Sequence, residues 1–406
     1  MKVLQVNKFF YVRGGSERYY FDLCDLLAER GHEVLHFSMT HPRNRPSPQA
    51  EMFMSHIDLN APMSAGERIA AAGRVLYSRE ATRRMEAIVE RYRPDVVHMH
   101  NISRQITPSI MSVTTAHGIP TVKTQHDYSL VCPAHTCFVR GKVCEDCLGG
   151  AYWHAVPKRC IDGSVTSSLL GAAEAYLHDI MGLYKKIDYI ISPSRFLMEK
   201  LMSLKWIGDR IGHLPYLIPL GEDWSERNDG YVLYSGRMTH EKGVKTLLEA
   251  AALMPGTKFI IAGEGPQLDE FKQYAASRRL GNVEFRGYVE GREHEALMEG
   301  AACIAVTSIS YENLPLSILE SFARGKPVVG SDCGGTVELV KDNETGFQYR
   351  RADADSLVEA IGNLLGDESA RVRMARNARE VVSGVCSPAY HYDRMMEIYA
   401  RVGACG

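Results

Sequence analysis

Short apolar runs alternate with longer amphipathic segments in the first half of the chain. The apolar runs of strand length are 3–7, 33–38, 95–98, 121–124 and 189–192. Between the first two, an amphipathic segment over 16–30 closed by Gly31 predicts a helix. This alternation is typical of a parallel sheet with helices on both faces, which binds its ligands at the carboxyl ends of the strands.

The same pattern starts again after residue 230. Predicted strands are 231–235, 258–262, 283–285, 303–307 and 328–331, and predicted helices are 243–253, 266–277, 292–300, 314–324 and 354–365. Between the halves, 217–223 and the polar residues 225–230 make the best linker candidate. A last amphipathic segment, 387–402, predicts a C-terminal helix.

Length and composition narrow the class of protein. A chain of 406 residues exceeds what one hydrophobic core usually serves, so two domains are expected. With 45% hydrophobic and 24% charged residues the composition is that of a soluble globular protein, and a formal net charge of -2 gives no indication of a nucleic-acid partner. No apolar run is long enough to cross a bilayer, and residues 1–7 are interpreted as a buried strand rather than a signal peptide, so we expect a cytoplasmic protein.

Two basic residues bracket a strand-to-helix turn in the second half. Arg237 and Lys242 lie in the segment 234–243, which follows a strand and opens a helix. The backbone N–H groups and helix dipole of such a turn attract anions, so two cations beside it predict a diphosphate clamp. The alternative is two solvated charges at a helix start. The next such turn, Gly263-Glu264-Gly265, has glycines that permit close approach to a base or ribose.

Two carboxylates in the segment 311–323 have seven residues between them. Glu312 precedes a predicted helix, and Glu320 lies within it among apolar residues. An unpaired carboxylate there would be costly, so we expect Glu320 to accept hydrogen bonds from ribose hydroxyls, and Glu312 from sugar hydroxyls. The alternative is an acidic residue near the helix dipole and one surface glutamate.

Two segments of the first half also carry candidate chemistry. Gly14 and Gly15 follow the first strand, where paired glycines let backbone N–H groups approach an anion or simply form a tight turn. His126 ends a strand and could donate a hydrogen bond or help a proton transfer, although a lone histidine is more often structural. His98 and His100, at the preceding strand, are weaker candidates. Asp127 is the one carboxylate to watch as a nucleophile.

Five of the ten cysteines lie close together between 132 and 160. Cys144 and Cys147 form a Cys-x2-Cys pair, and with Cys132 and Cys160 they predict a closed, structural four-cysteine zinc site. Metal binding would supply folding energy to a segment with no evident core. Cys137, His135 and His154 are further candidate ligands. The alternative to a zinc site is a set of reduced thiols.

The order Gly-Arg-x4-Lys-Gly, Gly-Glu-Gly-Pro, Glu-x7-Glu resembles the retaining glycosyltransferases of family 4, a subset of which has a similar cysteine-rich segment. The resemblance implies the GT-B fold, α/β with two facing Rossmann-like domains. Residues 1–218, with the cysteine-rich insert 132–160, would bind the acceptor; 219–386 would bind the nucleotide-sugar donor; and 387–406 would return to the first domain.

The resemblance also implies roles for individual residues. Arg237 and Lys242 would hold the donor diphosphate, towards which Gly14 and Gly15 reach, and His126 would lie beside the reacting sugar. The remaining donor contacts would come from the Gly263-Glu264-Gly265 turn, Glu312, the backbone amides of Asn313 and Leu314, and Glu320 on the ribose. The chain has Glu-Asn-Leu-Pro-Leu where many relatives have Glu-Gly-Phe-Gly-Leu-Pro, so contacts to the donor sugar are expected to differ.

The predicted function is retaining transfer of a hexose-type sugar to the hydroxyl of a sugar or lipid-linked saccharide, in bacterial surface polysaccharide or lipopolysaccharide assembly. UDP is favoured over GDP as the donor nucleotide, and catalysis needs no metal because cationic side chains replace it. Five arginines could face the inner membrane or form a solvated helix surface: Arg79, Arg83, Arg84, Arg91 and Arg93. The alternatives are a nucleotide-sugar epimerase on the same fold and a zinc-stabilised nucleotide-sugar-binding protein without transfer activity.

Overall fold

The computed structural model describes residues 1–58, 61, 64–221 and 227–404. It divides into two compact units, the first comprising 1–139, 144–217 and 388–406 and the second 140–143 and 218–387. Residues 222–226 of the predicted linker lie outside the described residues.

The first unit is built on a six-stranded parallel sheet in the order β2-β1-β3-β4-β7-β8. The strands are β1 (Lys2–Val6), β2 (Glu33–Phe37), β3 (Val96–Met99), β4 (Thr121–Thr124), β7 (Tyr189–Ser192) and β8 (Ile211–His213). The helices are α1 (Gly15–Glu29), α2 (Ala65–Leu76), α3 (Arg79–Tyr92), α4 (Met111–Ala116), α5 (Ala155–Lys158), α6 (Val165–Ile180), α7 (Arg195–Leu201) and α15 (Pro388–Arg401). The short strands β5 (Phe138–Val139) and β6 (Lys142–Val143) form a separate two-stranded sheet.

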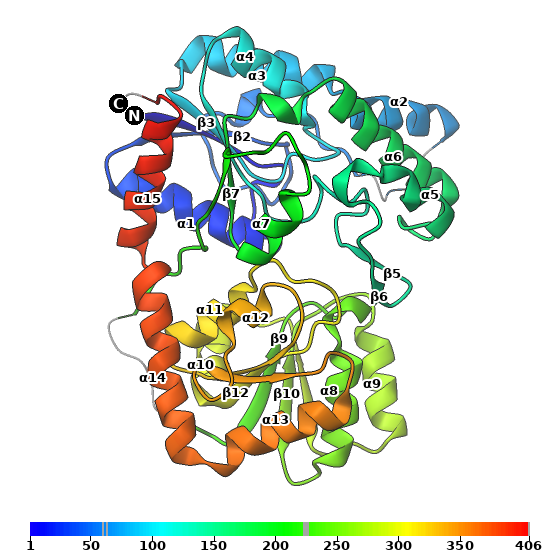
Figure 1. Cartoon of the computed structure of the whole chain (residues 1–406), viewed down its shortest axis with the longest axis vertical. Coiled ribbons are helices and arrows are strands. Elements are labelled where there is room, and N and C mark those ends of the chain that lie inside the picture. The colour runs from blue at the N-terminus through cyan, green and yellow to red at the C-terminus, as the bar shows by residue number, and fades with distance from the viewer. Residues whose placement is uncertain (59–60, 62–63, 222–226, 405–406) are drawn as a thin grey trace. The chain divides into compact units, whose positions relative to one another are not determined.

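The C-terminal helix α15 belongs to this first unit and lies beside α1 (Figure 1). Its buried face carries His391, Met395 and Tyr399. His391 Nε2 lies 3.0 Å from the hydroxyl of Tyr19 on α1, and the Tyr399 hydroxyl lies 2.8 Å from Nδ1 of His98. The C-terminal helix therefore packs against the first unit, as predicted.

The second unit has its own six-stranded parallel sheet in the order β11-β10-β9-β12-β13-β14. The strands are β9 (Tyr231–Ser235), β10 (Lys258–Ala262), β11 (Val283–Gly287), β12 (Ala301–Val306), β13 (Val328–Ser331) and β14 (Gly346–Tyr349). The helices are α8 (Val244–Leu253), α9 (Leu268–Ser277), α10 (Gly291–Gly300), α11 (Leu316–Ala323), α12 (Thr336–Leu339), α13 (Ala354–Gly366) and α14 (Glu368–Val385).

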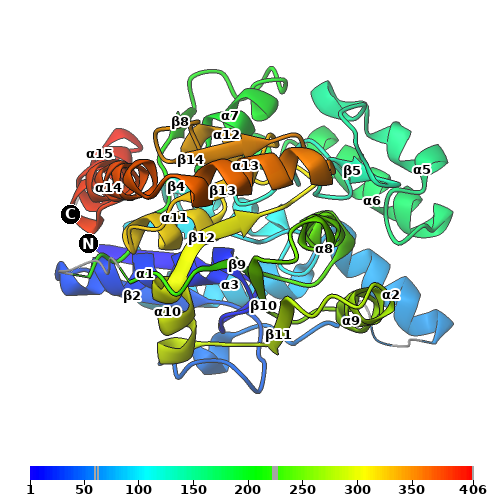
Figure 2. The ribbon, with the colours of Figure 1, turned by 90° about the horizontal axis from the view of Figure 1, so that it is seen from below.

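Helices cover both faces of this sheet, with α8, α9 and α13 on one side and α10 and α11 on the other (Figure 2). The strand order reverses direction between the adjacent strands β9 and β12. In doubly wound sheets the carboxyl ends of the strands at such a reversal form the binding crevice. The predicted fold class, two Rossmann-like α/β halves with parallel sheets, is confirmed.

Candidate functional site

Lys242 and Glu312 form an ion pair in the second unit. Lys242 lies in the turn between β9 and α8, and Glu312 in the loop between β12 and α11, so both follow the two central strands of the sheet. The Lys242 ammonium donates a hydrogen bond to Glu312 Oε1 at 2.6 Å, and the hydroxyl of Ser308 donates to the same oxygen. The side chains are 24% and 15% exposed, so the pair is largely shielded from water.

The two loops are held together by backbone contacts around Gly243. This residue has φ of +67°, and a Cβ built on it would lie 1.8 Å from the carbonyl oxygen of Thr307. The Thr307 hydroxyl donates to the Lys242 carbonyl at 2.8 Å, and the amide of Ile309 donates to the Glu241 carbonyl at 2.9 Å. A glycine is therefore required directly after Lys242 by both conformation and space.

The loop bearing Glu312 is fixed from its other side by the end of β13 and the segment that follows it. The amide of Gly335 donates to the Glu312 carbonyl at 2.8 Å, and the Ser331 hydroxyl donates to the Ser308 carbonyl at 2.7 Å. Burial acts to raise the pKa of the Glu312 carboxyl group, but the charge and hydrogen bond of Lys242, with Ser308 and Arg237, leave that pKa below its ordinary value. Glu312 is therefore a carboxylate at neutral pH and acts as a fixed hydrogen-bond acceptor.

Arg237 stands in the same turn as Lys242 with an exposed side chain. The turn packs against the Gly263-Glu264-Gly265 turn that follows β10: the amide of Met238 donates to the Glu264 carbonyl at 2.8 Å, and that of Gln267 to the Met238 carbonyl at 3.1 Å. The structure therefore brings the turn with Arg237 and Lys242 and the Gly263-Glu264-Gly265 turn side by side at the carboxyl ends of β9 and β10.

The structure places the remaining predicted donor residues close in sequence to Glu312. Asn313 and Leu314 are buried and precede α11, so their amides lie before its first turn. Glu320 lies on α11 and is half-buried, which differs from the predicted position among buried apolar side chains. The buried face of α11 is formed instead by Ile318, Leu319 and Phe322.

His126, at the end of β4 in the first unit, has both ring nitrogens in hydrogen bonds. Its Nε2 lies 3.0 Å from Nδ1 of His100, and its Nδ1 lies 2.8 Å from the Tyr216 hydroxyl. Burial, together with the charge of Lys123, lowers the pKa of His126 to about 3, so the ring is neutral at neutral pH.

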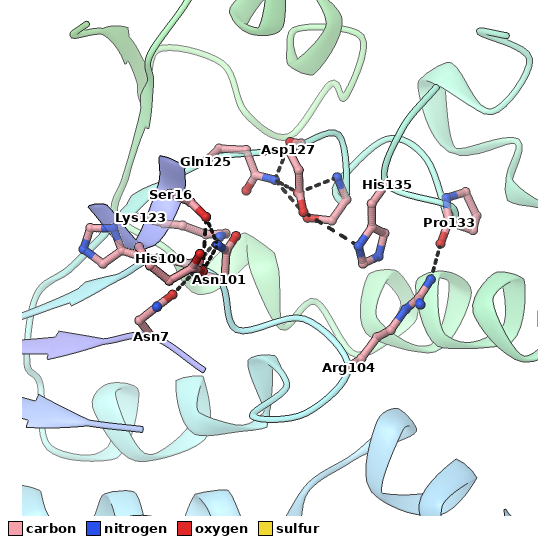
Figure 3. Close-up of polar contacts among 12 residues, drawn as sticks. Asn7, Ser16, His100, Asn101, Arg104, Lys123, Gln125, Asp127, Pro133 and His135 are labelled. Carbon is pink, nitrogen blue, oxygen red and sulfur yellow. Dashed lines mark hydrogen bonds and ion pairs between the residues drawn. The ribbon is translucent and has the colours of Figure 1, made fainter. Parts of the chain in front are cut away.

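Gly14 and Gly15 are exposed at the N-terminus of α1, before a network of polar side chains. Asn101 donates to the hydroxyl of Ser16 at 3.0 Å, and the buried ammonium of Lys123 donates to the His100 carbonyl at 2.7 Å (Figure 3). These groups come from the carboxyl ends of β3 and β4 and from the start of α1.

Asp127 is tied into the protein on both oxygens. Its Oδ1 accepts from the Ser129 amide at 2.9 Å and from the Gln125 side chain at 3.1 Å, and its Oδ2 lies 3.7 Å from Nδ1 of His135 (Figure 3). Burial acts to raise the pKa of Asp127, but His135 and Ser129 leave it lowered. This arrangement fits a structural carboxylate that shapes the loop after His126.

The predicted four-cysteine zinc site is not supported. Among the described residues, no group of three or more histidine, cysteine, aspartate or glutamate side chains is arranged to hold a metal ion. Cys132, Cys144, Cys147 and Cys160 do line one small cavity together with Cys137, and none of these five cysteines is in a disulfide. Lys158 donates to Cys144 Sγ at 3.2 Å and also pairs with Asp146, and a hydrogen bond between Cys132 and Cys137 lowers the pKa of Cys132 to about 6. These contacts supply the thiols of Cys132, Cys137 and Cys144 with hydrogen-bond partners from the protein.

Four residues with a place in these two clusters were not predicted from sequence as site residues. Ser308 and Gly335 bond to Glu312, while Gln5 and Tyr216 belong to the hydrogen-bond chain through His100 and His126. Each of these residues lies in or follows a strand of one of the two sheets. For Gly335, Gln5 and Tyr216 the hydrogen-bond partner lies far away in sequence, so the sequence alone does not show which residues come into contact.

Both halves of the chain match models of glycosyltransferase families. Residues 13–218 match the family model described as Glycosyltransferase Family 4, and residues 223–381 match Glycosyl transferases group 1. The lipopolysaccharide core biosynthesis glycosyltransferase LpsE of Rhizobium meliloti (strain 1021) is 31% identical over 170 residues, 42% of this chain and 49% of that protein. The aligned segment thus spans about half the length of LpsE.

Two solved structures show the same fold. Sucrose-phosphate synthase from Thermosynechococcus elongatus has a TM-score of 0.72 at 19% identity and covers 100% of both chains. HepE from Anabaena, in complex with UDP, has a TM-score of 0.69 at 16% identity over 99% of this chain and 100% of HepE. Within the described part of the chain, no helix combines the length and apolar character needed to span a membrane.

Proposed function

Because the chain belongs to glycosyltransferase family 4, we propose that it transfers a hexose-type sugar from a nucleotide diphosphate sugar to an acceptor hydroxyl with retention of anomeric configuration. The chain is a glycosyltransferase of GT-B fold. UDP is the favoured donor nucleotide, since the similarly folded HepE was solved with UDP, and GDP is the alternative. The process is surface polysaccharide or lipopolysaccharide assembly, as the name of LpsE indicates for that relative.

The observation that carries the proposal is the Lys242–Glu312 pair at the reversal of strand order, with Arg237 exposed beside it. An ammonium group has three N–H donors, and the bond to Glu312 uses one of them. Lys242 can therefore hold Glu312 and a diphosphate oxygen together. Arg237 adds a planar fork suited to phosphate.

In the proposed reaction the acceptor hydroxyl attacks on the face from which the diphosphate departs. The diphosphate takes the acceptor proton, and Arg237 and Lys242 stabilise the charge that develops on it. Glu312 fixes the transferred sugar through its hydroxyls, with the amides of Asn313 and Leu314, and Glu320 binds the ribose. The cations do the work of a catalytic metal, and Asp127, engaged by Ser129 and Gln125, is not assigned as a nucleophile.

The first unit would bind the acceptor, a sugar or a lipid-linked saccharide, and contribute Gly14, Gly15 and His126. Peripheral contact with the inner membrane is part of the proposal. Arg79, Arg83 and Arg91 are exposed on α3, while Arg84 donates to the Glu51 carbonyl. An anionic lipid surface would attract the exposed arginines of this helix.

A thermal-shift screen against UDP, GDP, ADP and their common sugar conjugates tests the donor site. A ligand that binds only the folded state raises the melting temperature by mass action, and a concentration of 100 times Kd adds about 2.7 kcal/mol of stability. A shift with UDP and UDP-sugars is the expected result. No shift with any nucleotide would count against the donor site itself.

Variants of the clamp locate the binding site. Arg237→Ala and Lys242→Ala should each weaken UDP binding by roughly ten-fold or more, because each removes a charge-assisted hydrogen bond. Lys245→Ala, on the exposed face of α8 next to the same turn, is the matched control and should bind UDP normally. Glu312→Ala should reduce transfer far more than binding of UDP alone; equal losses would remove Glu312 from contact with the sugar.

A further inference from the structure

Four aromatic rings are stacked at the carboxyl ends of β3 and β4 in the first unit. The ring of His98 lies 4.6 Å from that of His100 at 19°, and His100 lies 5.3 Å from His126 at 17°. The ring of Tyr216 follows His126 at 5.5 Å and 25°. The rings of His98, His100, His126 and Tyr216 together form a histidine stack.

A chain of hydrogen bonds runs through part of the histidine stack. Gln5, a fully buried residue on β1, has its Oε1 2.8 Å from Nε2 of His100. His100 Nδ1 lies 3.0 Å from His126 Nε2, and His126 Nδ1 lies 2.8 Å from the Tyr216 hydroxyl. Burial lowers the pKa of both histidines, so each ring is neutral and carries one N–H.

The amide oxygen of Gln5 sets the direction of this chain. An amide oxygen only accepts, so the proton of His100 lies on Nε2 and its Nδ1 accepts from His126. His126 then carries its proton on Nε2, and its Nδ1 accepts from Tyr216.

We propose that Gln5 and His100 are positioning residues that hold His126 in its Nε2–H tautomer, with the Nδ1 lone pair directed at Tyr216. The part of this inference that concerns catalysis rests on the proposed function, which places His126 beside the reacting sugar. His126 can accept a hydrogen bond from a hydroxyl at Nδ1 only while its proton stays on Nε2, and the partner of Nε2, His100, fixes that.

The substitution Gln5→Glu tests the direction of the chain. A buried carboxylate without a counter-charge is costly, so the variant takes up one proton. If that proton lies on His100, or on the carboxyl oxygen that faces His100, Nδ1 of His100 becomes a donor and forces the proton of His126 from Nε2 to Nδ1. The ring nitrogens of the two tautomers differ in 15N chemical shift, so a long-range 1H–15N spectrum of histidine-labelled protein, assigned with His126→Gln, reads the change directly.

Two further variants serve as an alternative test and as a control. Gln5→Met, similar in length but without an acceptor, should leave His126 as a mixture of tautomers, and serves if Gln5→Glu does not fold. His98→Gln is the matched control: His98 is equally buried and stacked on His100, but bonds to Tyr399 and Thr124. The control should leave the His126 spectrum in the Nε2–H form.

The kinetic readout is release of UDP from UDP-glucose with water as acceptor. We expect Gln5→Glu to lower kcat about ten-fold or more, with KM changed less than about two-fold, because the tautomer acts on the reaction and not on donor binding. An unchanged His126 spectrum in Gln5→Glu and Gln5→Met overturns the inference. A switched tautomer with unchanged kcat supports the positioning of His126 and removes His126 from the proposed reaction.

Discussion

At the scale of single residues, the ion pair between Lys242 and Glu312 joins two motifs that lie 70 positions apart in sequence. The motifs predicted Lys242 and Glu312 as site residues, and they predicted the turn and the loop in which these residues lie. It did not predict their bond, because that bond depends on β9 and β12 being neighbours in the sheet. Contacts of this kind follow from the strand order and not from local pattern.

We predict that Lys242→Met destabilises the second unit by roughly 2 kcal/mol. A fully buried carboxylate that loses its partner costs about 3–5 kcal/mol, and this pair keeps some access to water. Adding Glu312→Gln to the variant removes the uncompensated charge and should recover part of the stability. A urea-unfolding double-mutant cycle measures the coupling, expected at about 1 kcal/mol or more; additive losses would show that the pair does not stabilise the fold.

At the scale of elements, ten of the twelve strands of the two large sheets were predicted from apolar runs. The two that were not predicted, β8 and β14, each lie at one edge of their sheet. Each is short and contains a glycine, Gly212 or Gly346, so neither shows the continuous apolar run of a strand buried on both faces. The zinc site predicted for the cysteine-rich segment is not supported for a different reason. Residue spacing alone does not show whether thiols bind a metal or form hydrogen bonds with other side chains.

The turn that presents Lys242 gives a prediction for Gly243. Gly243→Ala should cost about 2–5 kcal/mol, because it adds the strain of a left-handed backbone to a collision with the Thr307 carbonyl. Gly287→Ala is the matched control, since Gly287 has φ of +69° with no atom within 4 Å of its added Cβ. It should cost only about 1 kcal/mol. Thermal unfolding of both variants measures the difference, and equal losses would mean that the Thr307 contact yields easily.

At the scale of the whole molecule, titratable histidines are distributed unevenly between the two units. The second unit holds two of the 15 histidines, His240 and His294. In the first unit burial lowers the pKa of His36 to about 4 and of His126 and His391 to about 3. His98 and His100 are lowered for the same reason.

The sign of the resulting pH dependence follows from linkage. These histidines gain protons near pH 6.5 when the chain is unfolded but remain neutral in the folded unit. Their stabilising contribution is therefore complete above about pH 6.5 and is lost as the pH falls towards their lowered folded pKa values. Each such histidine removes about 1.4 kcal/mol per pH unit in that window.

We therefore predict that acidification from pH 7 to pH 5 destabilises the first unit selectively. Hydrogen exchange followed by mass spectrometry, corrected for the intrinsic pH dependence of exchange, should show protection falling in β1, β3 and β4 while β9, β10 and β12 keep theirs. His36→Gln tests the cause, because it removes one titrating group while leaving a polar partner for the Tyr20 hydroxyl, which lies 2.9 Å from His36 Nδ1. The pH slope of the first unit should then decrease by about one proton; an unchanged slope, or an equal loss of protection in both units, would place the acid sensitivity elsewhere.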